Sequence, residues 1–186
     1  MGYFNPKPER NIFTDIILKW LVDIAVAVAA AVFLILFLGE KTNVIGNSMA
    51  DKIKSGQTVL IDKMSYELRD IKRFDVVVYR SDLSEEEYII KRVIGLPGEE
   101  IQIIDSRIYI NGEEIEDKYH KGSFESGAAS QTIKIGEDEY FVLGDNRNNS
   151  SDSRDPVVGN IHRNELIGKA WMRIYPFNQM CIIKHQ

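Results

Sequence analysis

The chain has 186 residues, with 23 Lys and Arg against 28 Asp and Glu and a formal net charge of −5. This length fits one main domain with a modest core. The acidic balance argues against a phosphate-binding surface, and so against nucleic acid as a partner, because such a surface needs clustered Lys and Arg. The single cysteine, Cys181, cannot form an internal disulfide, and we expect it to be a small buried residue near a strand end.

A long apolar run near the N-terminus predicts a membrane anchor. It extends from Trp20 to Gly39 and holds one ionisable residue, Asp23, close to its start. A helix of about 20 apolar residues spans a bilayer core of about 30 Å, so we predict a transmembrane helix over 16–39. A cleaved signal peptide would have a shorter apolar core of about 7–15 residues, and no small-x-small cleavage site follows the run. A buried helix of a soluble protein would need more chain to cover it.

The charges around this run predict its orientation. Three basic residues precede the run and one follows it closely: Lys7, Arg10, Lys19 and Lys41. Positive residues stay on the cytoplasmic side. We therefore expect a short cytoplasmic segment at 1–15, a single-pass anchor in the cell membrane, and an extracytoplasmic β-rich domain at 40–186, with the lipid bilayer as a partner.

The remainder of the chain predicts short β-strands. The candidate strand segments, some of them hairpins, are 58–64, 74–80, 87–96, 100–115, 131–145 and 165–176. Asn111-Gly112 is a strong hairpin turn because both residues accept positive φ, and Asp105-Ser106 marks another turn. We expect a mainly β fold, a folded-over sheet forming a partial barrel, with no long helix after the anchor.

Two residues outside any histidine motif are candidates for chemistry. Ser48 lies in VIGNSMAD, shortly after the apolar run. The three histidines, His120, His162 and His185, show no metal spacing and no serine elbow, and we expect each at the surface.

Lys91 lies among apolar residues in YIIKRVIGL, where a strand could bury it while Arg92 points the other way. A lysine general base must be neutral, and desolvation lowers its pKa from about 10.4. The alternative is a snorkelling lysine with an exposed ammonium group.

A polar segment, GDNRNNSSDSR, runs from Gly144 to Arg154 without an apolar residue. It could be a surface loop stabilised by Asx turns. It could also arrange carboxylate, guanidinium and hydroxyl groups around a buried ammonium group.

The order of these segments resembles the bacterial type I signal peptidases, which are membrane-anchored serine proteases with a Ser-Lys dyad. The resemblance rests on GNSM beyond an N-terminal anchor, RFDVVVY, KRVIGLPGE and GDNRNNSSDSR, and it extends to about Gly159. It implies a serine endopeptidase that cleaves signal peptides from exported preproteins after small-x-small sites, without a metal or organic cofactor. The hairpins fit the family's variable β extension, at about 99–140.

The resemblance also implies roles for particular residues. Ser48 matches the nucleophile, and its backbone N–H would be an oxyanion donor; Lys91 matches the general base. The remaining matched positions support the site: Met49, Ser150, Asp145, Asp152 and Arg154. Met49 would shape the substrate groove, Ser150 would hydrogen-bond the lysine, and the other three would give structural and electrostatic support. Gly46 stands where some members carry a hydroxyl that also binds the oxyanion.

The chain departs from the family pattern after the nucleophile. Ala50, Asp51 and Lys52 replace the usual sequence of any residue, Pro, and Ser or Thr. Loss of the proline would loosen this loop, and a nearby Asp51 carboxylate would raise the pKa of Lys91. This departure keeps an alternative open, a non-catalytic or specialised signal-peptidase-like factor in pilus assembly, with pilin or sortase partners. A self-cleaving Ser-Lys repressor is disfavoured. Such a protein carries an N-terminal DNA-binding domain, whereas this chain is net acidic and has an apolar run there.

Overall fold

The computed structural model describes residues 12–38, 40–50, 52–80 and 88–185. The chain divides into two compact units, unit 1 over 1–39 and unit 2 over 40–186. Unit 1 holds the helix α1 (Ile12–Leu38), and its stretch Phe13–Phe33 is the one described helix long and apolar enough to cross a membrane. A lone helix that is apolar on all sides cannot bury that surface by itself, and this fits the predicted anchor.

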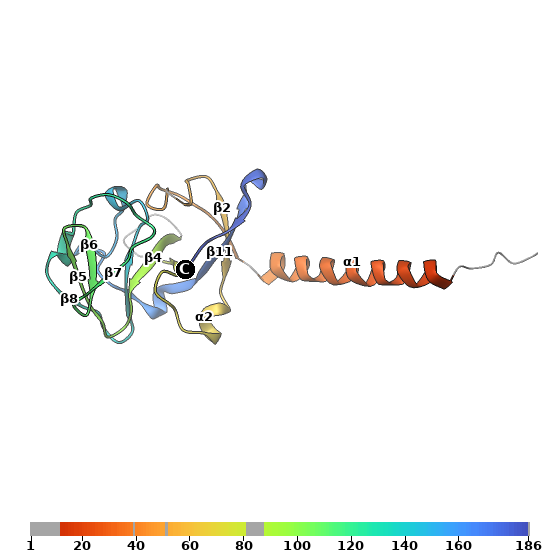
Figure 1. Ribbon diagram of the computed structural model, residues 1–186, viewed down its shortest axis with the longest axis horizontal. Coiled ribbons are helices and arrows are strands. Elements are labelled where there is room, and N and C mark those ends of the chain that lie inside the picture. Colours follow the sequence, from red (N-terminus) through yellow and green to blue (C-terminus); the bar gives the residue numbers. More distant parts are fainter. Residues whose placement is uncertain (1–11, 39, 51, 81–87, 186) are drawn as a thin grey trace, which may run out of the picture. The chain divides into compact units, whose positions relative to one another are not determined.

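Unit 2 is built on an eight-stranded antiparallel sheet, shown in Figure 1. Its strands are β1 (Glu40–Asn43), β2 (Thr58–Asp62), β3 (Val76–Tyr79), β4 (Ile89–Gly95), β9 (Glu139–Leu143), β10 (Ile161–His162), β11 (Leu166–Tyr175) and β12 (Cys181–Ile182). The order is β1-β2-β11-β3-β4-β9-β10, with β12 on β11. The long strand β11 pairs with β2 on one side and β3 on the other, with register shifts on both sides. Such bulges increase strand twist, so the sheet curls. The predicted mainly β, folded-over sheet is confirmed.

A second sheet of four strands forms the extension. It contains β5 (Glu100–Ile104), β6 (Arg107–Ile110), β7 (Glu113–Ile115) and β8 (Ile133–Lys134), in the order β7-β6-β5-β8. Both turn pairs predicted from sequence have positive φ, at 48° and 64° for Asp105 and Ser106 and at 52° and 83° for Asn111 and Gly112. In Figure 1 this sheet lies at one end of unit 2, away from β2 and β11.

The described helices after α1 are all short. They are α2 (Ser65–Leu68) and the 3₁₀ turns η1 (Gly127–Ser130), η2 (Arg147–Asn149), η3 (Arg163–Glu165) and η4 (Phe177–Gln179). This agrees with the expectation that no long helix follows the anchor in the described part of the chain.

The main sheet carries apolar side chains on both faces. Val76 and Val78 of β3 join one core cluster, while Val77 and Tyr79 join another. A third cluster packs the extension against β4 and β9, through Ile94, Phe141 and Leu143 among others. Strand β4 is therefore held from several directions, which makes it a rigid support for a site.

The expectation that Cys181 is buried was wrong. Cys181 is at a strand end, as predicted, but it is exposed. Strand β12 is only two residues long and pairs with β11 alone, so both of its residues stay accessible; the inward-facing apolar residue is Ile183.

Candidate active site

Lys91 is buried in the middle of β4. Its residue is 3% exposed, and its Nζ atom donates a hydrogen bond to Ser150 Oγ at 3.0 Å. Strand β4 pairs with β3 at Lys91 and with β9 at Arg92, so the backbone under both residues is fixed. The snorkelling alternative is wrong, because it requires the ammonium group to reach solvent.

Ser48 lies in the turn that follows β1, and this turn is attached to the loop after β9. The Ser48 carbonyl oxygen accepts a hydrogen bond from Asn146 N at 2.9 Å, and the Asn47 carbonyl oxygen accepts one from Asn146 Nδ2 at 3.0 Å. Met49 is buried, and its Sδ atom accepts a contact from Asp145 N at 3.3 Å. Met49 thus anchors the Ser48 turn, in addition to the groove role implied by the resemblance.

Gly144 brings the Ser48 turn and Ser150 together. A Cβ atom on Gly144 would lie 2.5 Å from the Ser48 carbonyl oxygen and 2.3 Å from Ser150 Oγ. Only a residue without a side chain allows this approach. Because Ser150 Oγ also contacts Lys91, the structure gathers Ser48, Ser150 and Lys91 in one neighbourhood.

Asp145 is locked to the strand that carries Lys91. Arg92 donates from Nε to Asp145 Oδ1 at 2.8 Å and from Nη2 to Oδ2 at 2.7 Å, and both side chains are almost fully buried. The Arg92 guanidinium also bonds the Phe74 carbonyl oxygen at 2.8 Å and lies 3.6 Å from the centre of the Tyr119 ring. Two parallel hydrogen bonds fix direction as well as distance, so this pair positions the polar loop on β4.

Asp152 and Arg154 form a second buried pair. Arg154 Nε and Nη2 bind the two Asp152 carboxylate oxygens at 2.8 and 2.9 Å, and Gly144 N donates to Oδ2 at 3.0 Å. Burial alone would raise the pKa of Asp152, but the hydrogen bonds and charge of Arg154 outweigh it and lower the pKa below its ordinary value. The carboxylate therefore stays ionised and holds Gly144 in place.

Arg147 is a buried residue to which the sequence analysis gave no role. Its Nε donates to the Gly144 carbonyl oxygen at 3.0 Å, and its guanidinium pairs with Asp117 at 2.7 Å. Burial lowers the pKa of Arg147, while Asp117 opposes this shift. Nothing in a polar run such as NRNNSSD distinguishes a buried arginine from an exposed one, so only the fold reveals it.

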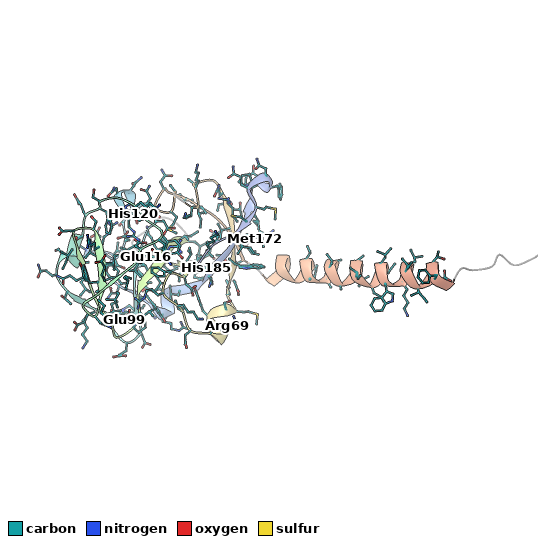
Figure 2. The ribbon with its side chains drawn as sticks, viewed as in Figure 1. Arg69, Glu99, Glu116, His120, Met172 and His185 are labelled. Atoms are coloured by element: carbon teal, nitrogen blue, oxygen red, sulfur yellow. The ribbon has the colours of Figure 1, made fainter. Side chains whose placement is uncertain are left out.

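One histidine contacts the polar loop, since His120 Nδ1 lies 3.3 Å from the Asp145 carbonyl oxygen. Among the described residues, no histidine hydrogen-bonds Ser48, and Figure 2 shows His120 and His185 well apart in unit 2. The expectation of surface histidines holds for His162 only, since the other two are half-buried. His185 Nδ1 accepts a hydrogen bond from Val76 N at 3.1 Å. In the described ranges, no group of three or more His, Cys, Asp and Glu side chains could hold a metal ion.

The sequence profile of the family described as "Signal peptidase, peptidase S26" matches residues 17–175. The chain belongs to this family. Signal peptidase I T of Bacillus subtilis (strain 168) is 34% identical to it over 175 residues, covering 90% of either chain. Signal peptidase I of Bacillus caldolyticus is 34% identical over 173 residues, covering 87% of this chain and 92% of that one. A crystal structure of a signal peptidase I from Enterococcus faecalis V583 aligns with 32% identity and a TM-score of 0.46, covering 54% of this chain and 97% of that one.

Membership in the S26 family makes the chain a peptidase with signal peptidase function. The matched range starts inside α1 and ends at the last residue of β11. It therefore includes the Ser48 turn, the strand of Lys91 and the whole polar loop, and the resemblance inferred from the four sequence segments is confirmed.

Proposed function

We propose that the chain is a signal peptidase I, a serine endopeptidase in which Ser48 is the nucleophile and Lys91 the general base. Its substrates are the signal peptide regions of exported preproteins, cut after small-x-small sites. The observation that carries this proposal is the burial of Lys91 with its Nζ atom 3.0 Å from Ser150 Oγ, beside the turn that presents Ser48.

The surroundings of Lys91 favour a neutral amine. Burial penalises the charged form of a lysine. Lys91 is 3% exposed, so its surroundings impose this penalty. A neutral Lys91 Nζ has a lone pair that can accept the Ser48 proton, which is what a general base requires.

The proposed roles of Ser48 and Lys91 give the following reaction. Ser48 Oγ attacks the scissile carbonyl carbon while Lys91 Nζ takes its proton, and the Ser48 backbone N–H stabilises the oxyanion. Lys91 then gives the proton to the leaving amine, and the C–N bond breaks. A water that loses a proton to Lys91 hydrolyses the acyl-enzyme, and the proton returns to Ser48. Ser150 orients the amine throughout.

The sequence Ala50-Asp51-Lys52, which departs from the family pattern after Met49, is compatible with catalysis. The backbone N–H groups of Lys52 and Ile53 both donate to the Met49 carbonyl oxygen, at 2.9 and 2.7 Å, and Ile53 is buried. Hydrogen bonds and packing thus hold the turn that a proline would otherwise stiffen. Asp51 lies outside the described residues. The alternative role in pilus assembly, with pilin or sortase partners, gains no support from the relatives above, which carry the name signal peptidase I.

The anchor explains how substrate and site meet. We assign 1–15 to the cytoplasm, 16–39 to the membrane and 40–186 to the outer side, with the variable extension at about 99–140. A peptide bound as an added strand would present small side chains to shallow pockets. Tethering at the membrane raises the effective concentration of a cleavage site that emerges from the same bilayer.

Cleavage of a preprotein by the purified full-length chain in detergent tests the proposal. We expect cleavage after a small-x-small site, identified by mass spectrometry, and its loss in both Ser48→Ala and Lys91→Ala. Lys134→Ala, an exposed lysine on β8, is the matched control and should remain active. Turnover that persists in Lys91→Ala, with folding verified by circular dichroism, would rule out the dyad.

A further inference from the structure

A cleft of about 660 Å³ gathers cations from segments that are far apart in the sequence. The cationic side chains that line this basic cleft are Lys52, Lys54, Arg92, Lys118, Arg173 and Lys184. Among the described residues, no carboxylate lines it, and neither do Ser48, Lys91 or Ser150. The cleft is therefore distinct from the proposed catalytic centre, and it concentrates positive charge in a chain whose net charge is −5.

Most of this charge is not neutralised within the described part of the chain. Arg92 is the exception, because its guanidinium group pairs with the Asp145 carboxylate. Arg173 binds only neutral oxygens, the carbonyls of Gln179 and Lys52 and the side-chain amide of Gln57, at 2.8, 3.1 and 3.2 Å.

The lysines of the cleft also form few ion pairs with described carboxylates. Lys118 has an exposed pair with Glu116 at 3.5 Å, a kind that contributes little. No ion pair joins Lys52, Lys54 or Lys184 to a described carboxylate. Like charges held around one cleft create a positive potential that attracts an anion.

The chemistry of the lining favours a phosphate group attached to an apolar body. Arginine and lysine together bind phosphate oxygens, arginine through its planar fork. Ile182 lines the cleft and is 63% exposed, and Met180 and Phe177 shortly before it are 52% and 77% exposed. Exposed apolar side chains beside Lys and Arg fit the boundary between headgroups and acyl chains of a bilayer better than they fit free phosphate.

The strand order places the cleft a few strands from β1 within unit 2. Across the sheet, Thr42 of β1 pairs with Val59, Val59 with Arg173, and Arg173 with Cys181. Three strand spacings amount to about 14 Å. Strand β1 begins at Glu40 and is the first strand of unit 2, so the cleft lies a few strands from the start of this unit.

We infer that the basic cleft binds the phosphate headgroup of an anionic phospholipid. The lysines and Arg173 contact the phosphate, and Ile182 and Met180 contact the start of the acyl chains. This second contact would hold unit 2 at the lipid surface. The inference goes beyond the proposed peptidase reaction and does not depend on it.

Cys181 provides a direct readout, because it is the only cysteine of the chain, is exposed and lines the cleft. The rate of its modification by iodoacetamide, an uncharged reagent, is measured on the full-length protein in a non-ionic detergent. We expect phosphatidylglycerol in the micelles to slow the reaction severalfold and phosphatidylcholine at the same mole fraction to leave it unchanged. The protection should weaken as salt is added.

Matched variants test whether lipid bound in the cleft causes the protection of Cys181. Lys54→Gln combined with Lys184→Gln should lose the protection, whereas Lys121→Gln combined with Lys134→Gln, two exposed lysines outside the cleft, should keep it. The same protection in Ser48→Ala separates this result from the peptidase proposal. Equal protection by phosphatidylcholine, or none by either lipid, overturns the inference. Equal protection by inorganic phosphate, or stronger protection by a hexaglutamate peptide, overturns the assignment to lipid.

Discussion

Ser150 is the side chain through which the polar loop holds Lys91. The alternative from sequence, an exposed lysine beside a surface loop, predicted no such contact, and the pattern YIIKRVIGL could not decide between the two. Lys91 and Arg92 lie on opposite faces of the strand, and the local sequence does not show whether the Lys91 face is covered. Whether Lys91 is buried depends on what covers its face of the strand, which here is a loop that lies more than 50 residues away in the chain.

Removing the Ser150 hydroxyl should slow catalysis without weakening substrate binding. Loss of a hydrogen bond to the base corresponds to about 1–3 kcal/mol, or about 5- to 150-fold in rate. We therefore expect Ser150→Ala to lower kcat by about this factor and to leave KM nearly unchanged. Ser151→Ala removes the neighbouring exposed hydroxyl and should have no effect. An equal loss in both variants would mean that Ser150 has no special role.

His185 should make the stability of unit 2 depend on pH. Burial, and next the nearby Lys169 charge, lower its pKa from 6.5 to about 4, although Asp75 opposes them. The unfolded chain binds a proton at His185 below about pH 6.5, whereas the folded chain resists it until about pH 4. This contribution to stability is thus complete above pH 6.5 and is lost as the pH falls to about 4.

The predicted loss from His185 between these pH values is up to about 3 kcal/mol. Thermal unfolding in detergent, followed by near-ultraviolet circular dichroism at several pH values, measures it. His185→Asn should flatten the dependence between pH 6.5 and 4, while His162→Asn, at an exposed position, should leave it unchanged. A slope that is identical in the wild type and His185→Asn would contradict this assignment.

At the scale of elements, alternation and turn chemistry predicted the strands and hairpins well. The positive φ values at Asn111 and Gly112 follow directly from their residue types. The order β2-β11-β3 could not be predicted, because β11 is inserted between strands that precede it by about a hundred residues. The pair between Arg92 and Asp145 also escaped prediction, since its partners lie 53 residues apart in the chain.

Breaking the pair between Arg92 and Asp145 should destabilise unit 2 strongly. Removal of one partner leaves a buried charge without compensation, which costs about 3–5 kcal/mol. We expect Arg92→Met to lower the stability by this amount, measured by thermal unfolding. Arg107→Met, at an exposed pair with Glu114, should cost less than about 1 kcal/mol.

The double variant of Arg92→Met and Asp145→Asn provides the rescue test. It leaves no unpaired ion, so we expect it to regain part of the lost stability. If Arg92→Met is no more harmful than Arg107→Met, the pair does not support the polar loop.

At the scale of the whole molecule, net charge was a poor guide to local charge. The balance of −5 argued against a phosphate-binding surface, yet folding brings six cationic side chains to one cleft. These residues are scattered between Lys52 and Lys184, so no window of the sequence shows them as a cluster. The net charge is a property of the whole chain, whereas the fold determines which charged side chains lie close together.

Membrane orientation is a prediction at this scale. In a Cys181→Ser background, Val157→Cys places a thiol on the exposed surface of unit 2, and Asn5→Cys places one before the helix. A membrane-impermeant maleimide applied to intact cells should label the first variant and should reach the second only after lysis. The reverse pattern would place the catalytic domain in the cytoplasm.

The proposed dyad is tested most directly by the pH dependence of kcat/KM for a preprotein, with Ser48→Ala as the blank. A buried Lys91 amine that acts as the base predicts a rate that reaches its plateau well below pH 10.4, the pKa of an ordinary lysine. A rate that is still rising near about pH 10.4, or cleavage that persists in Ser48→Ala, would contradict catalysis by Ser48 and a neutral Lys91.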